Sequence, residues 1–384
     1  MGMTKVDRAL LKALAALAAG MAVLQVFGQD SLTSVLFYLI FPLTVALWLR
    51  AVRKSVTGND ILVALTAVLA LICVLMDCAI SRGQLSFDYL KKGIMLAMTL
   101  LFFQAASRMR ADAGTVYFVH LVADLLTVAF AVTFLLRREQ MYLFNGVASD
   151  YLTFGFSNPN LATLFLTMLY MLRLCRMISD GKWRHGIWAA ALLLYFVVET
   201  GSRNALLTVA VFTVLVFCLR KKEKLHLGGV AAGLLAWIPI VFAAIYMILI
   251  RTDWFQSIFV FLSGEGKGLD SREEIWKRAW EAIVRSPLIG AYYAISDGAG
   301  VSQMHNSHLD IAASYGVAVL ALVCVLLRRW LESGRNCYIL GFAGALLLGL
   351  GEAAVFSGGL GIYIFAGIFL LLAKGAQDES CICQ

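Results

Sequence analysis

The sequence predicts an all-α polytopic membrane protein, and three observations support this class. Hydrophobic residues make up 61% of the 384 residues and charged residues only 15%, whereas soluble domains are about half apolar and a quarter charged. The mean hydropathy of +0.83 is too high to come from one anchor. Apolar runs of about 20 residues, the length of a spanning helix, recur along the chain. This composition excludes a soluble enzyme, a disordered chain and a secreted disulfide scaffold.

Twelve apolar segments are predicted to span the membrane, so that residues 1–384 form a single integral membrane domain. Asp77 lies inside the third segment, and Lys91 and Lys92 lie one turn into the fourth. The third and fourth segments are therefore the weakest of the twelve predictions. The segments are approximately 10–27, 31–49, 61–80, 88–107, 115–136, 158–175, 186–200, 203–219, 227–250, 308–327, 337–354 and 358–373.

The distribution of Lys and Arg predicts that both termini lie in the cytoplasm. In this orientation the inner segments are all short and hold most of the 32 basic residues, as the positive-inside rule requires. The net charge of +8 therefore reflects topology and does not indicate nucleic-acid binding. Lys5, Arg8 and Lys12 precede an apolar run that we expect to be a first membrane helix and not a signal peptide.

The loop 251–307, before the tenth segment, is predicted to be extracytoplasmic and partly helical. Ser271 and Glu274 form a capping-box pattern, and Pro287 ends the helix that follows. The pattern predicts an interfacial helix over about 271–286, with two Trp on one face. Its apolar side chains recur with helical spacing at Ile275, Trp276, Ala279, Trp280, Ile283 and Val284.

Two cations do not fit the positive-inside distribution. Arg203 lies in the tight outer turn 200–204, where burial is costly unless the guanidinium meets an anion or a water-filled cavity. Glu199 is one candidate partner, and the phosphate oxygens of a ligand are the other. Arg272 lies in the first turn of the predicted loop helix, where the helix dipole disfavours a cation. An exposed, solvated arginine is the alternative there.

Polar residues also gather at two predicted helix starts. His305 and Asn306 precede a helix that we expect to begin near Ser307, where backbone N–H groups favour anions and a histidine exchanges protons near neutral pH. The alternative for His305 is an ordinary interfacial polar residue. Asn158 and Asn160 flank Pro159 at the start of the sixth segment, and helix capping explains them without a further role.

Other chemistry-bearing patterns are missing from the sequence. Phosphate-binding glycine loops, zinc spacings and a nucleophile elbow do not occur, so we expect no metal and no cofactor. His120 and Asp124 share a helix face, but two ligands do not make a metal site. The eight cysteines are expected to be small buried hydrophobes. Four acidic residues in or near apolar stretches have no assigned role, namely Asp77, Asp124, Asp310 and Glu352.

Three blocks together resemble the O-antigen ligase/polymerase family of bacterial membrane glycosyltransferases, and residues 158–162 add weaker support. The resemblance covers about residues 140–330. Tyr315 departs from the family pattern, which often has an acidic residue there, so it is given no role. The blocks are Thr200-Gly201-Ser202-Arg203-Asn204-Ala205-Leu206-Leu207, Asp270-Ser271-Arg272-Glu273-Glu274-Ile275-Trp276 continuing to Ser286-Pro287-Leu288-Ile289-Gly290, and His305-Asn306-Ser307-His308-Leu309 followed by Tyr315-Gly316.

This resemblance implies a GT-C-type fold and an active site on the outer face of the bacterial cytoplasmic membrane. It implies transfer of a glycan from an undecaprenyl-pyrophosphate carrier, without a metal and with inversion at the anomeric carbon. Carried onto matching positions, His305 is the general base, while Arg203 and Arg272 hold the pyrophosphate. Asn306, Asn158, Asn160 and Glu199 are candidates for supporting roles, with helix capping as the alternative for Asn158 and Asn160.

We predict a polymerase of carrier-linked repeat units, and several alternatives stay open. An O-antigen ligase uses the same chemistry with lipid A-core as the acceptor. A lipid-linked oligosaccharide flippase or transporter predicts functional charges near mid-membrane, whereas these cations lie toward the outer face. A purely structural envelope subunit leaves Arg203 and His305 unexplained. Expected partners are the carrier-linked glycan donor, the glycan acceptor, membrane lipid and other polysaccharide export or chain-length proteins.

Overall fold

The computed structural model describes residues 2–82, 87–144, 147–156, 159–181, 183–219, 225–255, 257, 270–291, 304–357 and 361–375. Within these ranges the regular structure is helical apart from a short antiparallel pair, β1 (Leu143–Phe144) and β2 (Val147–Ala148). The helices are α1 (Lys5–Val26), α2 (Asp30–Lys54), α3 (Gly58–Arg82), α4 (Phe87–Arg108), α5 (Ala113–Leu136), η1 (Arg138–Tyr142), α6 (Pro159–Asp180), α7 (Trp183–Glu199), α8 (Arg203–Leu219), α9 (Gly229–Leu249), α11 (Asp270–Arg285), α13 (Ser307–Glu332), α14 (Tyr338–Leu348), α15 (Ala354–Ser357) and α16 (Ile362–Leu372).

Each of the twelve predicted segments contains a helix, which supports a polytopic helical membrane protein. Among the described residues, seven helices are long and apolar enough to cross a membrane, namely α1, α2, α3, α5, α6, α9 and α13. Four more are apolar but shorter, namely α7, α8, α14 and α16. The helix α4, which carries Lys91 and Lys92, is in neither group. A count of twelve spans therefore stays a prediction.

The predicted eleventh segment, 337–354, is not one continuous helix. The helix α14 ends at Leu348, and the chain turns through Gly349 and Glu352 before α15 begins at Ala354. Local hydropathy does not reveal this break, because the residues on both sides of it are apolar. The break is decided by hydrogen bonds from other helices, and it shapes the site described below.

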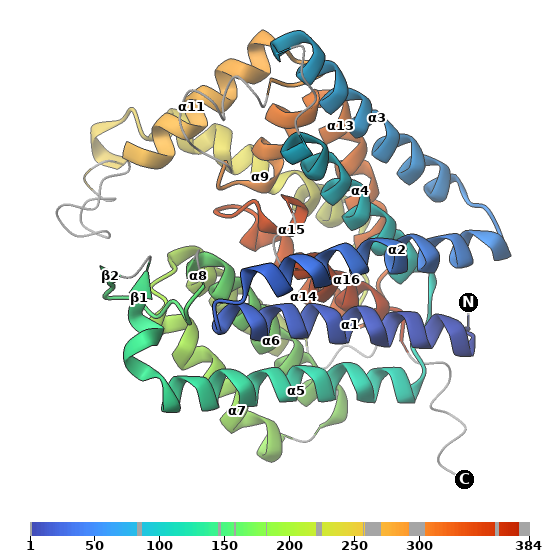
Figure 1. Cartoon of the computed structure of the whole chain (residues 1–384), viewed down its shortest axis with the longest axis vertical. Coiled ribbons are helices and arrows are strands. Elements are labelled where there is room, and N and C mark those ends of the chain that lie inside the picture. The colour runs from blue at the N-terminus through green and yellow to red at the C-terminus, as the bar shows by residue number, and fades with distance from the viewer. Residues whose placement is uncertain are drawn as a thin grey trace.

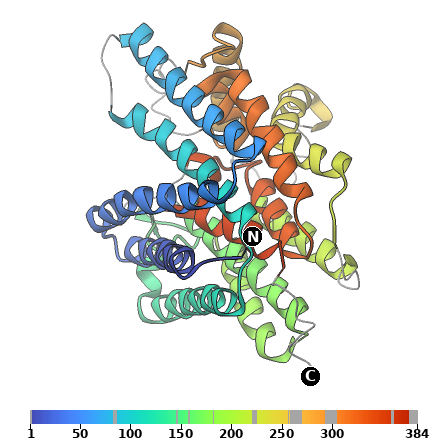
Figure 2. The ribbon, with the colours of Figure 1, turned by 90° about the vertical axis from the view of Figure 1, so that its right-hand side faces the viewer.

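Three short helices of the C-terminal part lie in the middle of the molecule. α14, α15 and α16 are surrounded by the longer helices, with α1 and α5 on one side and α3, α9 and α13 on the other (Figure 1). Turned by a right angle, the N-terminal helices gather on one side and the segments coloured yellow on the other (Figure 2). In the most hydropathic stretches of α6 and α13, 78% and 72% of the residues are buried, whereas in those of both α2 and α9 the share is 28%. Most residues of these stretches of α2 and α9 are therefore not covered by protein, as is expected for helices that contact lipid.

Ion pairs hold several helix ends on the predicted cytoplasmic side. Asp7 of α1 lies 2.7 Å from the Arg50 guanidinium and 3.3 Å from the Lys54 ammonium, both on α2. Asp60 of α3 pairs with Arg108 of α4. Cations that define the topology are therefore partly neutralised by carboxylates at the same ends, which lowers the cost of bringing these helices together.

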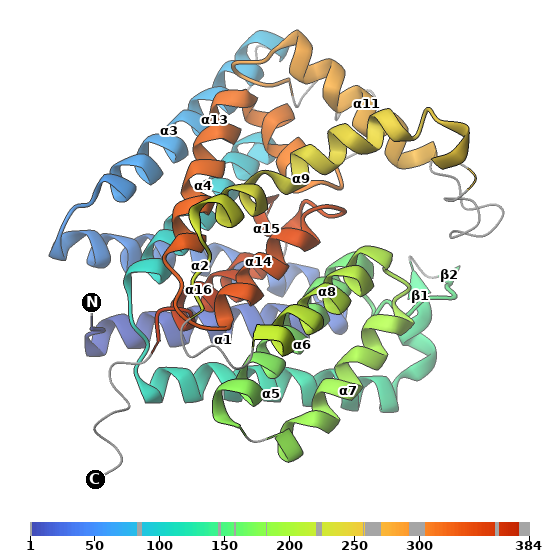
Figure 3. The ribbon, with the colours of Figure 1, turned by 180° about the vertical axis from the view of Figure 1, so that it is seen from behind.

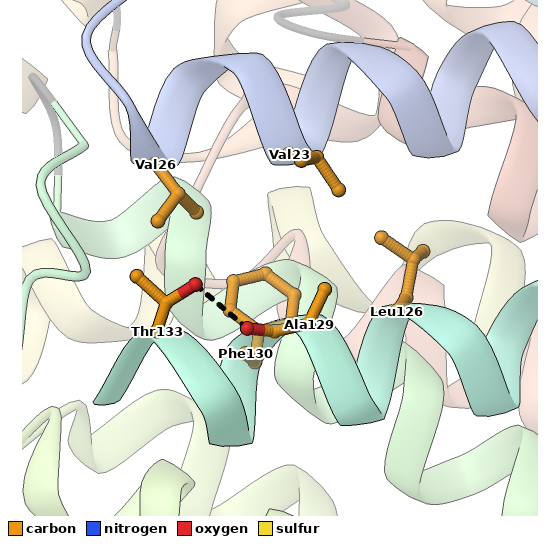
Figure 4. Close-up of a pocket in the computed structure, with 6 residues that line it drawn as sticks. All are labelled: Val23, Val26, Leu126, Ala129, Phe130 and Thr133. Carbon is orange, nitrogen blue, oxygen red and sulfur yellow. Dashed lines mark hydrogen bonds between the residues drawn. The ribbon is translucent and has the colours of Figure 1, made fainter. Parts of the chain in front are cut away.

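A small void between α1 and α5 is a packing gap and not a ligand site. It holds about 10 Å³, roughly the space of one water molecule. The only hydroxyl in its lining, on Thr133, points along its own helix and donates to the Ala129 carbonyl at 2.7 Å (Figure 4). Its other lining residues are Val23, Val26, Leu126, Ala129 and Phe130.

Candidate active site

The first turn of α13 is capped by Asn306. Its side-chain oxygen accepts hydrogen bonds from the backbone N–H groups of His308 at 3.1 Å and Leu309 at 2.9 Å. The helix begins at Ser307, as the sequence predicted, and the residue before it is the cap. An Asn cap satisfies two N–H groups that a helix cannot satisfy internally.

The break after α14 is stabilised by the same segment and by α8. Unpaired carbonyl groups are costly within a membrane, so a helix can stop there only where other groups donate to its last carbonyls. Gly349 allows the close approach, because a Cβ at this position would lie 2.3 Å from the Ser307 hydroxyl. The donors are Asn204 Nδ2 to Leu348 O at 2.7 Å, Ser307 N to Gly349 O at 2.9 Å and Asn306 Nδ2 to Leu350 O at 3.2 Å.

This break brings Glu352 to His305. One carboxylate oxygen of Glu352 lies 3.4 Å from His305 Nδ1. The Glu352 side chain is 7% exposed and the His305 side chain 28%, so the carboxylate is enclosed while the ring keeps an open side. If His305 donates to the Glu352 carboxylate from Nδ1, then Nε2 is the ring nitrogen left to accept a proton.

The backbone at His305 is held in an unusual conformation. Its φ is +49°, in the left-handed region, which costs a non-glycine residue roughly 1 to 3 kcal/mol. The neighbours on both sides are anchored. The Met304 carbonyl accepts a hydrogen bond from the Trp276 indole of α11 at 2.7 Å, and Asn306 is the helix cap. The backbone that carries the imidazole is therefore held by an anchored residue on each side of it.

A proline in α9 supplies further anchor points for this segment. Pro239 has no N–H group, so the regular helical hydrogen bond to the carbonyl four residues before it, on Leu235, is lost. Two other carbonyls of this stretch accept hydrogen bonds from the segment that begins α13. Asn306 Nδ2 lies 2.9 Å from the Pro239 carbonyl, and His308 Nε2 lies 2.7 Å from the Ala236 carbonyl. His308 is completely buried and used in this contact, which distinguishes it from the partly open His305.

Lys92 and Asp310, for which the sequence offered no role, form an ion pair beside this segment. The Lys92 ammonium of α4 lies 2.9 Å from the Asp310 carboxylate, which is in the first turn of α13. Their side chains are only 11% and 5% exposed. A buried charge requires such a partner, and removing one member leaves the other unpaired. The pair therefore fixes the start of α13 against α4.

Helix α11 is joined to α13 through the loop that follows it. The N–H of Ala291 donates to the Ala313 carbonyl at 2.8 Å, and the N–H of Val317 donates to the Pro287 carbonyl at 2.8 Å. These bonds replace helical ones where α13 is interrupted at Gly316, whose φ is +86°. A Cβ at Gly316 would lie 2.2 Å from the Leu288 carbonyl oxygen, so only glycine fits there.

These contacts link the three sequence blocks. Arg203 is the first residue of α8 and is exposed, and its neighbour Asn204 is bonded to the end of α14. Arg272 lies in the first turn of α11, one turn before Trp276, and its side chain is outside the described residues. α11 already begins at Asp270, so Ser271 lies within its first turn and not at the predicted cap position.

The supporting residues named from the sequence have different surroundings. Glu199, at the end of α7, accepts a hydrogen bond from the Tyr142 hydroxyl at 2.9 Å. Burial, together with this contact, raises the pKa of Tyr142 to about 12. Asn160 is the second residue of α6 and is half-buried. Asn158 lies outside the described residues.

Two further polar residues in apolar stretches have structural partners. His120 Nε2 lies 3.0 Å from the Tyr338 hydroxyl. Asp124 lies 2.9 Å from the Arg173 guanidinium and 3.0 Å from that of Arg176, both on α6. In the part of the chain that the structure describes, no three His, Cys, Asp or Glu residues gather into a candidate metal site.

Part of the region that builds this site is similar in sequence to a known family. Residues 188–324 match the family model of O-antigen ligase. The match confirms the resemblance to the O-antigen ligase/polymerase family, and its range contains Arg203, Arg272 and His305. No curated protein matches the chain.

Lys92 and Glu352 lie outside the range matched by the O-antigen ligase model, and only the fold brings them to the site. Sequence reasoning marked Glu352 as an acidic residue near an apolar stretch but did not connect it with His305. The available signal was its position just after Gly349 and Gly351, where a helix break places a carboxylate inside the bundle.

Proposed function

We propose that the protein is a membrane glycosyltransferase that polymerises undecaprenyl-pyrophosphate-linked oligosaccharide repeat units. The observation that carries the proposal is the contact of His305 with Glu352, at the junction where the blocks of the O-antigen ligase family meet. A histidine with one nitrogen against a carboxylate and its ring partly open is arranged as a general base.

In the proposed step, the hydroxyl of an acceptor sugar attacks the anomeric carbon of the carrier-linked glycan. His305 Nε2 takes the hydroxyl proton as the new carbon–oxygen bond forms. The bond from the anomeric carbon to the pyrophosphate oxygen breaks, and the undecaprenyl pyrophosphate leaves with the electron pair. Attack opposite the leaving group inverts the anomeric configuration. The activated carrier supplies the free energy, so no nucleotide is consumed.

Arg203 and Arg272 are proposed to hold the pyrophosphate. Guanidinium groups form paired hydrogen bonds to phosphate oxygens, and they stabilise the charge that develops on the leaving group. Two guanidinium cations can do this without a metal, so the proposed reaction is metal-independent. Arg203 begins α8, where the backbone N–H groups of a helix start also favour an anion.

The proposed site faces the outer side of the cytoplasmic membrane. The distribution of basic residues supports this orientation, with both termini inside and the loops that carry Arg203, Arg272 and His305 outside.

The O-antigen ligase reaction is the second candidate, because the matching family model carries that description. It uses the same base and the same leaving group, and only the acceptor differs, being lipid A-core. No contact within the described residues separates the two acceptors.

Purified protein in lipid vesicles, given carrier-linked repeat units alone, tests the proposal. A ladder of products supports the polymerase, and the His305→Ala protein is the negative control. Transfer only after lipid A-core is added supports the ligase instead. No glycan transfer with either acceptor contradicts both. A chelator included in parallel should leave the rate unchanged, and lost activity that returns with added metal contradicts the metal-independent route.

A further inference from the structure

A groove runs between the end of α9 and the outer side of α11. The groove has a volume of about 620 Å³. The helices α9 and α11 lie next to each other when the molecule is seen from the front and from behind (Figures 1 and 3). Its lining residues are Ala244, Met247, Ile248 and Arg251 from α9 and the turn after it, and Lys277, Trp280, Glu281, Val284 and Arg285 from α11.

The groove is separate from the proposed catalytic site. α11 turns Trp276, Ala279 and Ile283 inward, where all three are buried, and Trp276 bonds to Met304. The groove uses the neighbouring face of the helix, with Lys277 and Val284 exposed. The sequence predicted one apolar stripe for this helix, but the structure divides it between the protein core and this groove.

The floor of the groove is apolar and continues a face of α9 that is suited to lipid. Val241, Ile245 and Ile248 are 47%, 49% and 68% exposed and recur with helical spacing. α9 is one of the helices long and apolar enough to span a membrane. An alkyl chain lying along this face would bury these side chains.

The rim of the groove carries excess positive charge. Arg251, Lys277 and Arg285 line it against a single carboxylate, Glu281. None of the three cations forms an ion pair within the described residues. Cations at the end of a spanning helix lie at headgroup level and attract anionic lipid. Trp280 adds a donor, because its indole N–H is buried and has no hydrogen-bond partner among the described residues.

We propose that this groove binds one anionic glycerophospholipid of the outer leaflet. Its phosphate lies among Arg251, Lys277 and Arg285, and one acyl chain follows α9 past Ile248. A soluble anion leaves the apolar floor unused, and a zwitterionic lipid leaves the excess charge unbalanced. The bound lipid would join α11 to α9, and so support the helix that carries Arg272.

Nanodiscs with the full-length protein test this proposal, with phosphatidylglycerol or phosphatidylcholine as the probe lipid and native mass spectrometry as the readout. Phosphatidylglycerol should be retained selectively. Lys277→Gln should weaken its retention about fivefold, since each surface cation near the membrane has an effect of that size. Arg278→Gln is the matched control, because Arg278 neighbours Lys277 but pairs with Glu274 and does not line the groove.

A second readout locates the lipid independently of charge. Phosphatidylglycerol with brominated acyl chains should quench the fluorescence of Trp280, and the quenching should fall in Trp280→Phe. Equal retention of both lipids, or equal loss in Lys277→Gln and Arg278→Gln, overturns the proposal. Retention of a polyprenyl pyrophosphate in place of the phospholipid also overturns it. Glycan transfer is not used in either readout, so the result is independent of the proposed function.

Discussion

Asn306 supports the site through four hydrogen bonds, which makes its substitution the most quantitative test of the structure. Its oxygen accepts from His308 N and Leu309 N, and its amide donates to the carbonyls of Pro239 and Leu350. Loss of an Asn cap costs about 1 kcal/mol. Loss of each donated bond to a carbonyl costs about 1 kcal/mol more. Asn306→Ala should therefore lower the free energy of unfolding by about 3 kcal/mol.

A serine variant separates these two contributions. Asn306→Ser keeps a good cap but loses both amide donors, so it should cost about 2 kcal/mol, and its difference from Asn306→Ala should be about 1 kcal/mol. Unfolding by sodium dodecyl sulfate in mixed micelles, followed by tryptophan fluorescence, measures both values. Asn59→Ala is the control, because Asn59 makes one exposed hydrogen bond, to Arg329 at 2.6 Å.

The Asn59 control should change stability by no more than about 0.5 kcal/mol, as is usual for surface positions. The reasoning fails if Asn306→Ala is no more destabilising than Asn59→Ala. It also fails if Asn306→Ser is as stable as the parent, because the break after α14 would then not depend on the amide donor.

The remaining predictions concern the proposed chemistry and one backbone contact. His305→Ala and Arg272→Ala should abolish glycan transfer while membrane insertion is retained, and full activity in either protein would contradict the assigned roles. Arg203→Lys should slow transfer at least about tenfold, because lysine cannot form the paired hydrogen bonds of a guanidinium. Glu352→Gln should lower kcat about a hundredfold with little change in KM, since the base is disoriented but substrate contacts remain; an unchanged kcat refutes this. Gly316→Ala should destabilise the protein by about 2 kcal/mol in the same unfolding assay, because its φ of +86° and the Leu288 carbonyl exclude a side chain; parental stability would contradict it.

The amino-acid sequence was sufficient to predict the membrane class and the position of every long helix. Hydropathy and helical spacing are local properties, so α1 to α9 and the first part of α13 follow from composition along the chain. The three sequence blocks likewise indicated Arg203, Arg272 and His305, and residues 188–324 match the family that they resemble. Local pattern also placed a helix at Asp270–Arg285, within one residue at each end.

Only the tertiary structure decided which side chains meet. His305 and Glu352 are 47 residues apart, and Lys92 and Asp310 are 218 residues apart, so no local pattern connects them. The break after Leu348 has the same origin. An apolar run continues as a helix unless donors from elsewhere take its last carbonyls, and in this protein those donors come from Asn204 and the Asn306 segment. The sequence by itself determined the helices and the unusual charges, whereas the packing of distant segments determined the site.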